Sequence, residues 1–72
     1  MKQVLYTTPE TLPKDFATFR HLAELSQKEV GKRTHSSQQV ISKLETGDSV
    51  LHYDQVFAIA KAMGIDELRV VL

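Results

Sequence analysis

Apolar residues recur at helical spacing after a short N-terminal arm. Residues 2–7 are rich in strand-forming side chains and are followed by Pro9, which predicts a short strand or arm within residues 1–10. A first helix is expected over residues 14–24, because Pro13 suits the first position of a helix. Its predicted buried stripe consists of Phe16, Phe19, Leu22 and Ala23.

A second helix is predicted over residues 27–34. Ser26 and Glu29 have the S-x-x-E spacing of a capping box, in which each side chain accepts a hydrogen bond from the other's backbone amide. The segment His35-Ser36-Ser37 interrupts this helix. We therefore expect a tight turn there.

A third helix is expected to follow the turn. Ser36 or Ser37 can cap it, and Gly47 ends it where a left-handed residue is wanted. Ile41 and Leu44 can share a buried stripe with Val30 of the preceding helix. The opposite face is polar and carries Gln38, Gln39, Ser42, Lys43 and Thr46.

The last third of the chain predicts a loop, a fourth helix and a strand. A loop or turn over residues 48–51 leads to a helix over residues 53–63, which Gly64 stops. Residues 67–72 alternate in polarity and are rich in β-branched side chains, which favours a terminal strand. This apolar edge needs a partner, either a second copy of the chain or the arm at residues 3–6.

Composition limits the classes of function. Seventy-two residues form one domain, residues 1–72, with a core so small that dimerisation is a physical expectation. The chain has no cysteine, no signal-peptide pattern and no long apolar run, so we expect a cytoplasmic protein with no membrane partner. The histidines, residues 21, 35 and 52, lack metal-ligand spacing, and no phosphate loop or nucleophile elbow is present. We therefore predict no enzyme, no metal site and no cofactor.

Charge is uneven although the net charge is zero. Residues 26–47 hold four basic and two acidic side chains, a surplus of +2, whereas residues 48–72 hold two basic and four acidic ones, a balance of −2. Two short helices joined by a tight turn form a helix-turn-helix, whose second helix enters the DNA major groove. The positive segment thus coincides with the predicted DNA-reading element.

The 23 residues LSQKEVGKRTHSSQQVISKLETG, positions 25–47, carry a family resemblance. They resemble, without a gap, the helix-turn-helix of the phage repressor and Cro family, also called the xenobiotic-response-element family. The resemblance implies an all-α, lambda-repressor-like domain of four to five helices, here with short terminal β-strands. It also implies a homodimer that binds double-stranded DNA at a palindromic operator.

Base readout is expected from the start of the third helix. The amides of Gln38 and Gln39 can each donate to and accept from adenine, although exposed glutamine is also an ordinary helix former. The positions of the family that touch DNA correspond to Ser37, Gln38, Gln39, Val40 and Lys43. Val40 can contact a thymine methyl or pack into the core.

Phosphate contacts are expected from the preceding helices. Gln27 lies at a helix start, where free amides favour a phosphate, and Ser26 can add a hydroxyl to its capping role. In many members of the family an arginine–carboxylate pair orients the arginine toward DNA, and here Arg20 and Glu45 occupy those positions; the alternative is two independent surface residues.

The chain departs from the family in the turn. Gly31 stands where alanine is usual and allows a close helix contact, whereas His35 stands where glycine is usual and must adopt or avoid a left-handed conformation. Thr34 replaces a buried aliphatic residue. These departures make the start of the third helix uncertain by one residue.

The terminal strand narrows the resemblance to HipB-like antitoxins. In those proteins an apolar C-terminal strand helps two subunits to embrace, and a kinase-type toxin is bound and silenced. The acidic C-terminal segment is where such a toxin contact is expected. The alternatives are a phage Cro-like switch and another stand-alone repressor, neither of which has a toxin partner.

Overall fold

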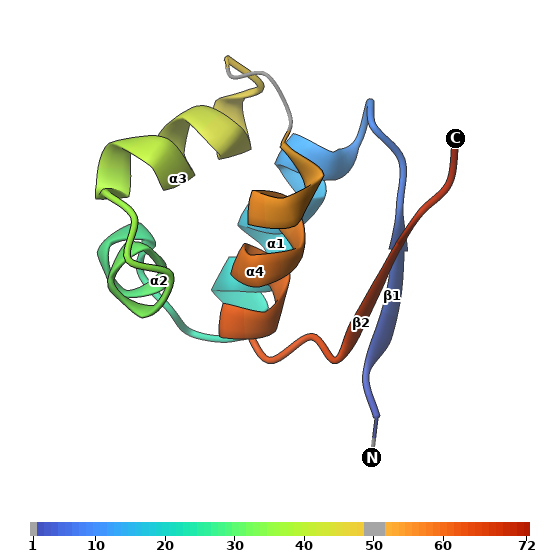
Figure 1. Ribbon diagram of the computed structural model, residues 1–72, viewed down its shortest axis with the longest axis horizontal. Helices are drawn as coiled ribbons and strands as arrows, with labels where there is room; N and C mark the ends of the chain where they lie inside the picture. Colours follow the sequence, from blue (N-terminus) through green and yellow to red (C-terminus); the bar gives the residue numbers. More distant parts are fainter. Residues whose placement is uncertain (1, 49–51) are drawn as a thin grey trace.

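The computed structural model describes residues 2–48 and 52–72, in which four helices lie between two short strands. Figure 1 shows α2 and α3 on one side of the molecule, the strands on the other, and α1 and α4 between them. The predicted fold class is confirmed. The elements in chain order are β1 (Val4–Thr7), α1 (Leu12–Leu22), α2 (Gln27–Arg33), α3 (Gln38–Thr46), α4 (Tyr53–Ala62) and β2 (Glu67–Val70).

One apolar core joins the helices to the sheet. Val30 of α2 and Ile41 and Leu44 of α3 are buried together in it, as their spacing predicted. Of the described helices, none is both long enough and apolar enough to cross a membrane. The largest fully buried side chains are Leu12, Phe16, Val30, Ile41, Val56 and Ile59.

Helix α1 begins and ends two residues earlier than predicted. Its buried residues are Leu12, Phe16 and Arg20, one every fourth position, while Phe19 is half-buried. The predicted burial of Leu22 and Ala23 is wrong, because Leu22 is 78% exposed and Ala23 is also exposed. The helix ends at Leu22. The face that packs against the core is therefore the one that carries Leu12, Phe16 and Arg20.

The two strands pair in parallel, with Val4 opposite Glu67 and Thr7 opposite Val70. The sequence left two partners for the C-terminal strand, the N-terminal arm or a second copy of the chain. The arm pairs with one edge of β2. The buried Thr7 hydroxyl donates to Asp15 Oδ2 at 2.7 Å, which fastens β1 to α1. Strand β2 ends at Val70, two residues before the predicted end.

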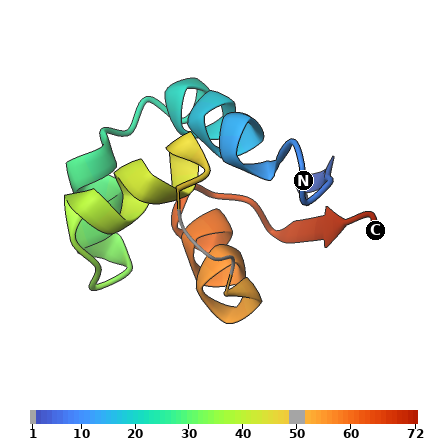
Figure 2. The same ribbon diagram turned by 90° about the horizontal axis from the view of Figure 1, so that it is seen from above.

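Helix α4 covers the core from the side opposite to α1 (Figure 2). Its last helical residue is Ala62, one residue earlier than predicted, and Gly64 follows in the left-handed region at φ 86°. His52 precedes the helix without a side-chain capping bond. Residues 49–51 of the predicted loop lie outside the described residues.

Candidate nucleic-acid interface

Helix α2 begins with the predicted capping box. The Ser26 backbone N–H donates to Glu29 Oε1, the Glu29 backbone N–H donates to Ser26 Oγ, and both distances are 3.0 Å. The bond from the Ser26 amide, with a smaller contribution from its hydroxyl, lowers the pKa of Glu29. The start of α2 is therefore fixed by local hydrogen bonds, and Gln27 is its first residue.

The turn after α2 closes by a pair of backbone hydrogen bonds. Ser36 N–H donates to the Gly31 carbonyl at 2.7 Å and His35 N–H donates to the Lys32 carbonyl at 3.3 Å, the pattern of a Schellman motif. His35 adopts the left-handed conformation, with φ 56°. Thr34 stands where the family has a buried aliphatic residue. Its hydroxyl donates to the Val30 carbonyl at 2.9 Å, so the polar group has a hydrogen-bond partner.

Helix α3 is capped by Ser37 rather than Ser36. Its hydroxyl accepts from the Val40 backbone N–H at 3.3 Å, and Gln38 is the first helical residue. Gly47 ends the helix at φ 81°, as predicted. The Ser37 cap and Gly47 fix the two ends of α3, and the helix begins at Gln38.

The outer face of α3 is polar and open. Figure 1 shows this helix along one border of the molecule, and Figure 2 looks onto its outer side. Val40 is half-buried between that face and the core, as is Ser42. The exposed side chains are Ser37, Gln38, Gln39, Lys43 and Thr46.

A buried ion pair ties α1 to α3, so of the two alternatives for Arg20 and Glu45 the structure shows the pair and not two independent surface residues. Arg20 Nε donates to Glu45 Oε2 at 2.7 Å and Arg20 Nη2 donates to Glu45 Oε1 at 3.0 Å, and the two side chains are only 11% and 8% exposed. Arg20 Nη1 also donates to the Leu25 carbonyl at 3.0 Å. Hydrogen bonding to Glu45 raises the pKa of Arg20, although burial acts in the opposite direction.

Gln27 joins this pair to the start of α2. Its amide Nε2 donates to Glu45 Oε1 at 3.1 Å, so one carboxylate holds both Arg20 and Gln27. The network fixes the first turn of α2 against the last turn of α3. Arg20 thus has a positioning role in the structure, and its direct contact with DNA stays a prediction.

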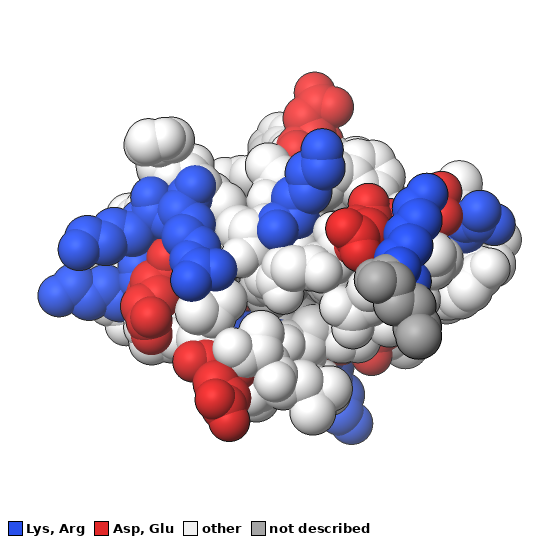
Figure 3. Space-filling model, turned by 90° about the horizontal axis from the view of Figure 1, so that it is seen from below, with Lys and Arg blue, Asp and Glu red and all other residues white. Residues whose placement is uncertain are grey.

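Basic side chains project from α2. Figure 3 shows Lys and Arg gathered at the left edge of the molecule, where α2 lies in Figure 1. Lys28, Lys32 and Arg33 are the exposed basic residues of this helix. Arg33 Nη1 donates to the Ala62 carbonyl at the end of α4, at 3.1 Å. Sequence reasoning missed this contact, since its partner lies 29 residues away.

The predicted site residues therefore fall into two connected groups. Ser37, Gln38, Gln39 and Lys43 share the open face of α3, with Val40 at its border. Arg20, Ser26 and Gln27 lie where α1 ends and α2 begins, and Glu45 links Arg20 and Gln27 to α3. Glu45 is the residue that connects the groups.

The chain matches the sequence profile of a known family. The sequence profile of the family described as Helix-turn-helix matches residues 18–69, most of the chain. No curated protein and no solved structure matches the chain.

Proposed function

The chain belongs to the helix-turn-helix family of the phage repressor and Cro type, a family of DNA-binding transcription regulators, and we propose that it is a repressor that reads a palindromic operator through α3. The observation that carries this proposal is the open polar face at the capped start of α3. There Gln38 and Gln39 are exposed and follow a serine whose hydroxyl fixes the helix start.

The chemistry of this face suits base readout. A glutamine amide can bond both N6 and N7 of adenine in the major groove, and Lys43 lies one turn further along the same helix. The half-buried Val40 would present a methyl group to thymine at the edge of the contact. We assign sequence reading to Gln38, Gln39 and Lys43, with support from Ser37 and Val40.

Phosphate contacts would set the register of α3 in the groove. Gln27 is held at the first turn of α2 through Glu45, and the adjoining Ser26 adds a capped helix start. Arg20 would fix this arrangement from behind, with its guanidinium bonded to Glu45. Such contacts position a protein on the duplex without reading its sequence.

A palindromic operator requires two copies of the chain, and we infer that they meet at the free edge of β2. Two recognition helices about 34–36 Å apart each lie about 17–18 Å from the two-fold axis. The molecule measures 27 and 26 Å along its two longer axes, and β2 lies across it from α3 in Figure 1. A two-fold axis beside β2 therefore suits the spacing of successive major grooves.

The backbone of β2 supports the same edge. Glu67 N–H donates to the Gln3 carbonyl and Val71 N–H donates to the Thr7 carbonyl, at 3.1 and 2.8 Å, so the alternate groups of Leu68 and Val70 face away from β1. In the described residues the sheet consists of β1 and β2 alone. An unpaired edge of this kind can accept another strand.

Side-chain charge selects one register for an antiparallel pair of β2 strands. With Leu68 opposite Leu68 of the second copy, Glu67 lies opposite Arg69 of the second copy, and the pair occurs twice. Centring the strands on Arg69 would instead place two like charges opposite each other, which is unfavourable. The Leu68-centred register therefore agrees best with the sequence of β2.

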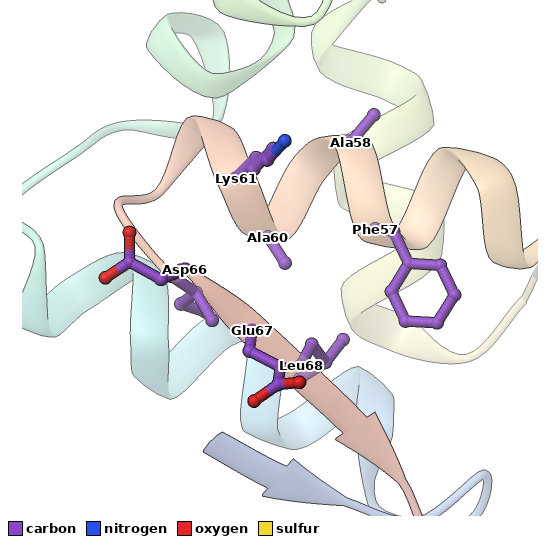
Figure 4. Close-up of a pocket in the computed structure, with 8 residues that line it drawn as sticks. Phe57, Ala58, Ala60, Lys61, Asp66, Glu67 and Leu68 are labelled. Carbon is purple, nitrogen blue, oxygen red and sulfur yellow. The ribbon is translucent and has the colours of Figure 1, made fainter. Parts of the chain in front are cut away.

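An apolar groove of about 320 Å³ beside β2 would receive the second copy. Figure 4 shows this groove between α4 and β2, with Phe57 on the helix side and Glu67 and Leu68 on the strand. Phe57 is 45% exposed, which is high for a large apolar residue on a helix that otherwise buries Val56, Ile59 and Ala60. A second copy would cover it.

The DNA-binding proposal is tested by selection from a random duplex library with the purified protein. We expect enriched sequences with two-fold symmetry and half-sites whose centres are about one helical turn apart, 10–10.5 base pairs. Binding that enriches no sequence and varies only with salt would contradict sequence-specific reading.

As the finer function, we propose an autoregulating antitoxin of a HipBA-like pair, which also binds a kinase-type toxin. Its support is the apolar C-terminal strand, on which the resemblance to these antitoxins rests, and the acidic balance of residues 48–72. A phage Cro-like switch or another stand-alone repressor is the alternative, and the same α3 face would serve it equally.

A pull-down of the tagged protein from its own cells separates these two. Palindromic DNA from its own promoter together with one stoichiometric protein of kinase type would support the antitoxin. The same DNA without a protein partner would support the stand-alone repressor. Recovery of a protein without DNA would contradict both.

A further inference from the structure

A histidine lies at the solvent side of the buried ion pair. Arg20 and Gln27 both donate to Glu45, and Arg20 Nη2, which bonds Glu45 Oε1 at 3.0 Å, also lies 3.4 Å from His21 Nε2. His21 is exposed, whereas Arg20 is only 9% exposed. The imidazole is therefore the most exposed member of a network of four side chains.

The contact with Arg20 defines the charge state of His21. Arginine stays protonated in proteins and has no hydrogen-bond acceptor, so Arg20 Nη2 is the donor and His21 Nε2 is the acceptor. Nε2 accepts only while it carries no proton, which means that the imidazole is neutral with its proton on Nδ1. An imidazolium has two N–H donors and loses this contact. Histidine is the side chain that ordinarily changes between these two forms at about pH 5–8.

Protonation of His21 adds a positive charge to a region that is otherwise balanced. The charged side chains where the ends of α1 and α3 meet the start of α2 are Arg20, Glu24, Lys28, Glu29, Lys43 and Glu45. Three of them are positive and three are negative, so an imidazolium gives the region a positive surplus. His21 also lies in the last turn of α1, where the helix dipole favours a cation.

We propose that His21 links DNA binding to proton uptake: the neutral imidazole accepts from Arg20, whereas the imidazolium leaves Arg20 and donates to the DNA phosphate that Gln27 binds. This inference rests on the phosphate contact proposed for Gln27. The two side chains belong to the same network, since Glu45 Oε1 accepts from both Arg20 Nη2 and Gln27 Nε2. The proton comes from the solvent, and the new bond is charge-assisted at both ends.

The direction of the pH effect distinguishes this role from a purely structural one. If His21 only held Arg20 against Glu45, protonation would release Arg20 and weaken DNA binding in mild acid. If the imidazolium binds phosphate, protonation strengthens DNA binding instead. By linkage, DNA raises the proton affinity of His21 by the same factor by which protonation raises the affinity for DNA. The affinity for DNA should therefore be highest in mild acid and decrease as the pH rises.

The experiment measures the affinity of the wild type for the selected duplex at about pH 6 and about pH 8, at constant salt concentration. We expect tighter binding at the lower pH, by about three- to tenfold for each copy of the chain, as for one charge-assisted contact. Affinity for unrelated duplex DNA should rise by a similar factor, because phosphate contacts do not read sequence. Calorimetry in two buffers of different ionisation enthalpy should detect the proton uptake directly.

Two variants assign the effect to one histidine. His21→Gln retains an amide oxygen that can accept from Arg20 but does not titrate, so its affinity for the selected duplex should be the same at both pH values. The matched control, His35→Asn combined with His52→Gln, leaves His21 as the one histidine of the chain and should keep the wild-type pH dependence. Asparagine suits position 35 because it tolerates the left-handed conformation that His35 adopts.

A wild-type affinity that does not change with pH, or that falls in mild acid, would overturn the inference and leave the DNA-reading role of α3 in place. A pH dependence that persists in His21→Gln, or that disappears in the control variant, would also overturn it. The control variant keeps the His21 network intact, so it tests the inference even if His21→Gln does not fold. Failure of the wild type to select any sequence would instead reject the proposed function, and its binding to unrelated duplex DNA would still show or exclude proton uptake at His21.

Discussion

The helix pair α2–α3 and the two-stranded sheet are held by contacts of different range. The starts of α2 and α3 have serine caps whose hydrogen bonds join residues three apart in the sequence. Next to the sheet, Gln3 N–H donates to Asp66 Oδ2, which lies 63 residues away in the sequence. The two regions also differ in their ion pairs. The side chains of Arg20 in α1 and Glu45 in α3 are almost fully buried. Those of Arg69 and Glu67 on β2 are 56% and 36% exposed, with Arg69 Nη2 and Glu67 Oε2 3.3 Å apart.

This difference suits the two tasks proposed for the molecule. A reading helix needs a fixed position, which local caps and a buried bidentate pair supply. An exposed strand edge with alternating charges keeps backbone groups available for a second chain. Substitutions at the buried pair and at the strand edge should therefore affect different properties of the protein.

Removal of the buried carboxylate should have the largest effect. Glu45→Ala leaves the Arg20 guanidinium buried without its main partner, which we expect to cost about 3–5 kcal/mol of unfolding free energy, measured by urea titration. The control is Glu10→Ala, which removes an exposed carboxylate in the segment before α1 and should change the unfolding free energy by about 0.5 kcal/mol or less. Equal small losses from both variants would contradict the structural role given to the Arg20–Glu45 pair.

Proline at the last residue of β2 and at the residue after it should distinguish strand pairing within one chain from strand pairing between two copies. Val70→Pro removes an N–H that faces away from β1, so the fold should persist while the dimer weakens by about 1–3 kcal/mol for each lost bond. Val71→Pro removes the donor to the Thr7 carbonyl and should instead destabilise the fold. Sedimentation analysis of both variants gives the dimer constant; a wild-type constant for Val70→Pro would reject the β2 edge as the interface.

The smallest effect concerns the pH dependence of the α2 cap. The pKa of Glu29 is lower in the folded protein than in the unfolded chain, because Ser26 bonds its carboxylate. This stabilisation is therefore complete above the unfolded pKa of about 4.3 and is lost as pH falls through the lower folded pKa. Glu29→Gln cannot titrate, so its difference in unfolding free energy from the wild type should be largest at pH 7 and shrink in acid. A difference in unfolding free energy that grows as pH falls would contradict the lowered pKa of Glu29 in the folded protein.

The same contrast explains what the sequence could predict. The start of α2 followed from Ser26 and Glu29 and the end of α3 from Gly47, because caps are local and leave a spacing of three residues or a single glycine. Helix α2 ends at Arg33, one residue before its predicted end. The choice between Ser36 and Ser37 could not be made locally, since both can cap a helix. The structure selects Ser37, which its hydroxyl bond to Val40 N–H shows directly.

The buried face of α1 could not be predicted in the same way. Phe16, Phe19, Leu22 and Ala23 have good helical spacing, but an equally regular set at Leu12, Phe16 and Arg20 is the buried one. The choice depends on Glu45, 25 residues away, which makes burial of Arg20 possible. An analysis of apolar spacing treats every arginine as a surface residue. The partner of Arg20, Glu45, was therefore indicated only by the family resemblance and is shown by the structure.

Strand pairing shows the same limit. The alternation of residues 67–72 indicated a strand that needs a partner, and both the N-terminal arm and a second copy fitted that need. The parallel register between Val4 and Glu67 depends on the path of four helices between them. No local pattern in either strand encodes that path.

Base reading by the capped start of α3 is tested by the affinity of Gln38→Ala/Gln39→Ala for the selected duplex. We expect binding to weaken by about 1–3 kcal/mol for each bidentate contact removed, while the dimer constant and the affinity for unrelated DNA stay unchanged. Gln3→Ala, an exposed glutamine on the arm, is the control and should bind as the wild type does. Unchanged affinity of the double variant for the selected duplex would contradict the placement of the reading face on α3.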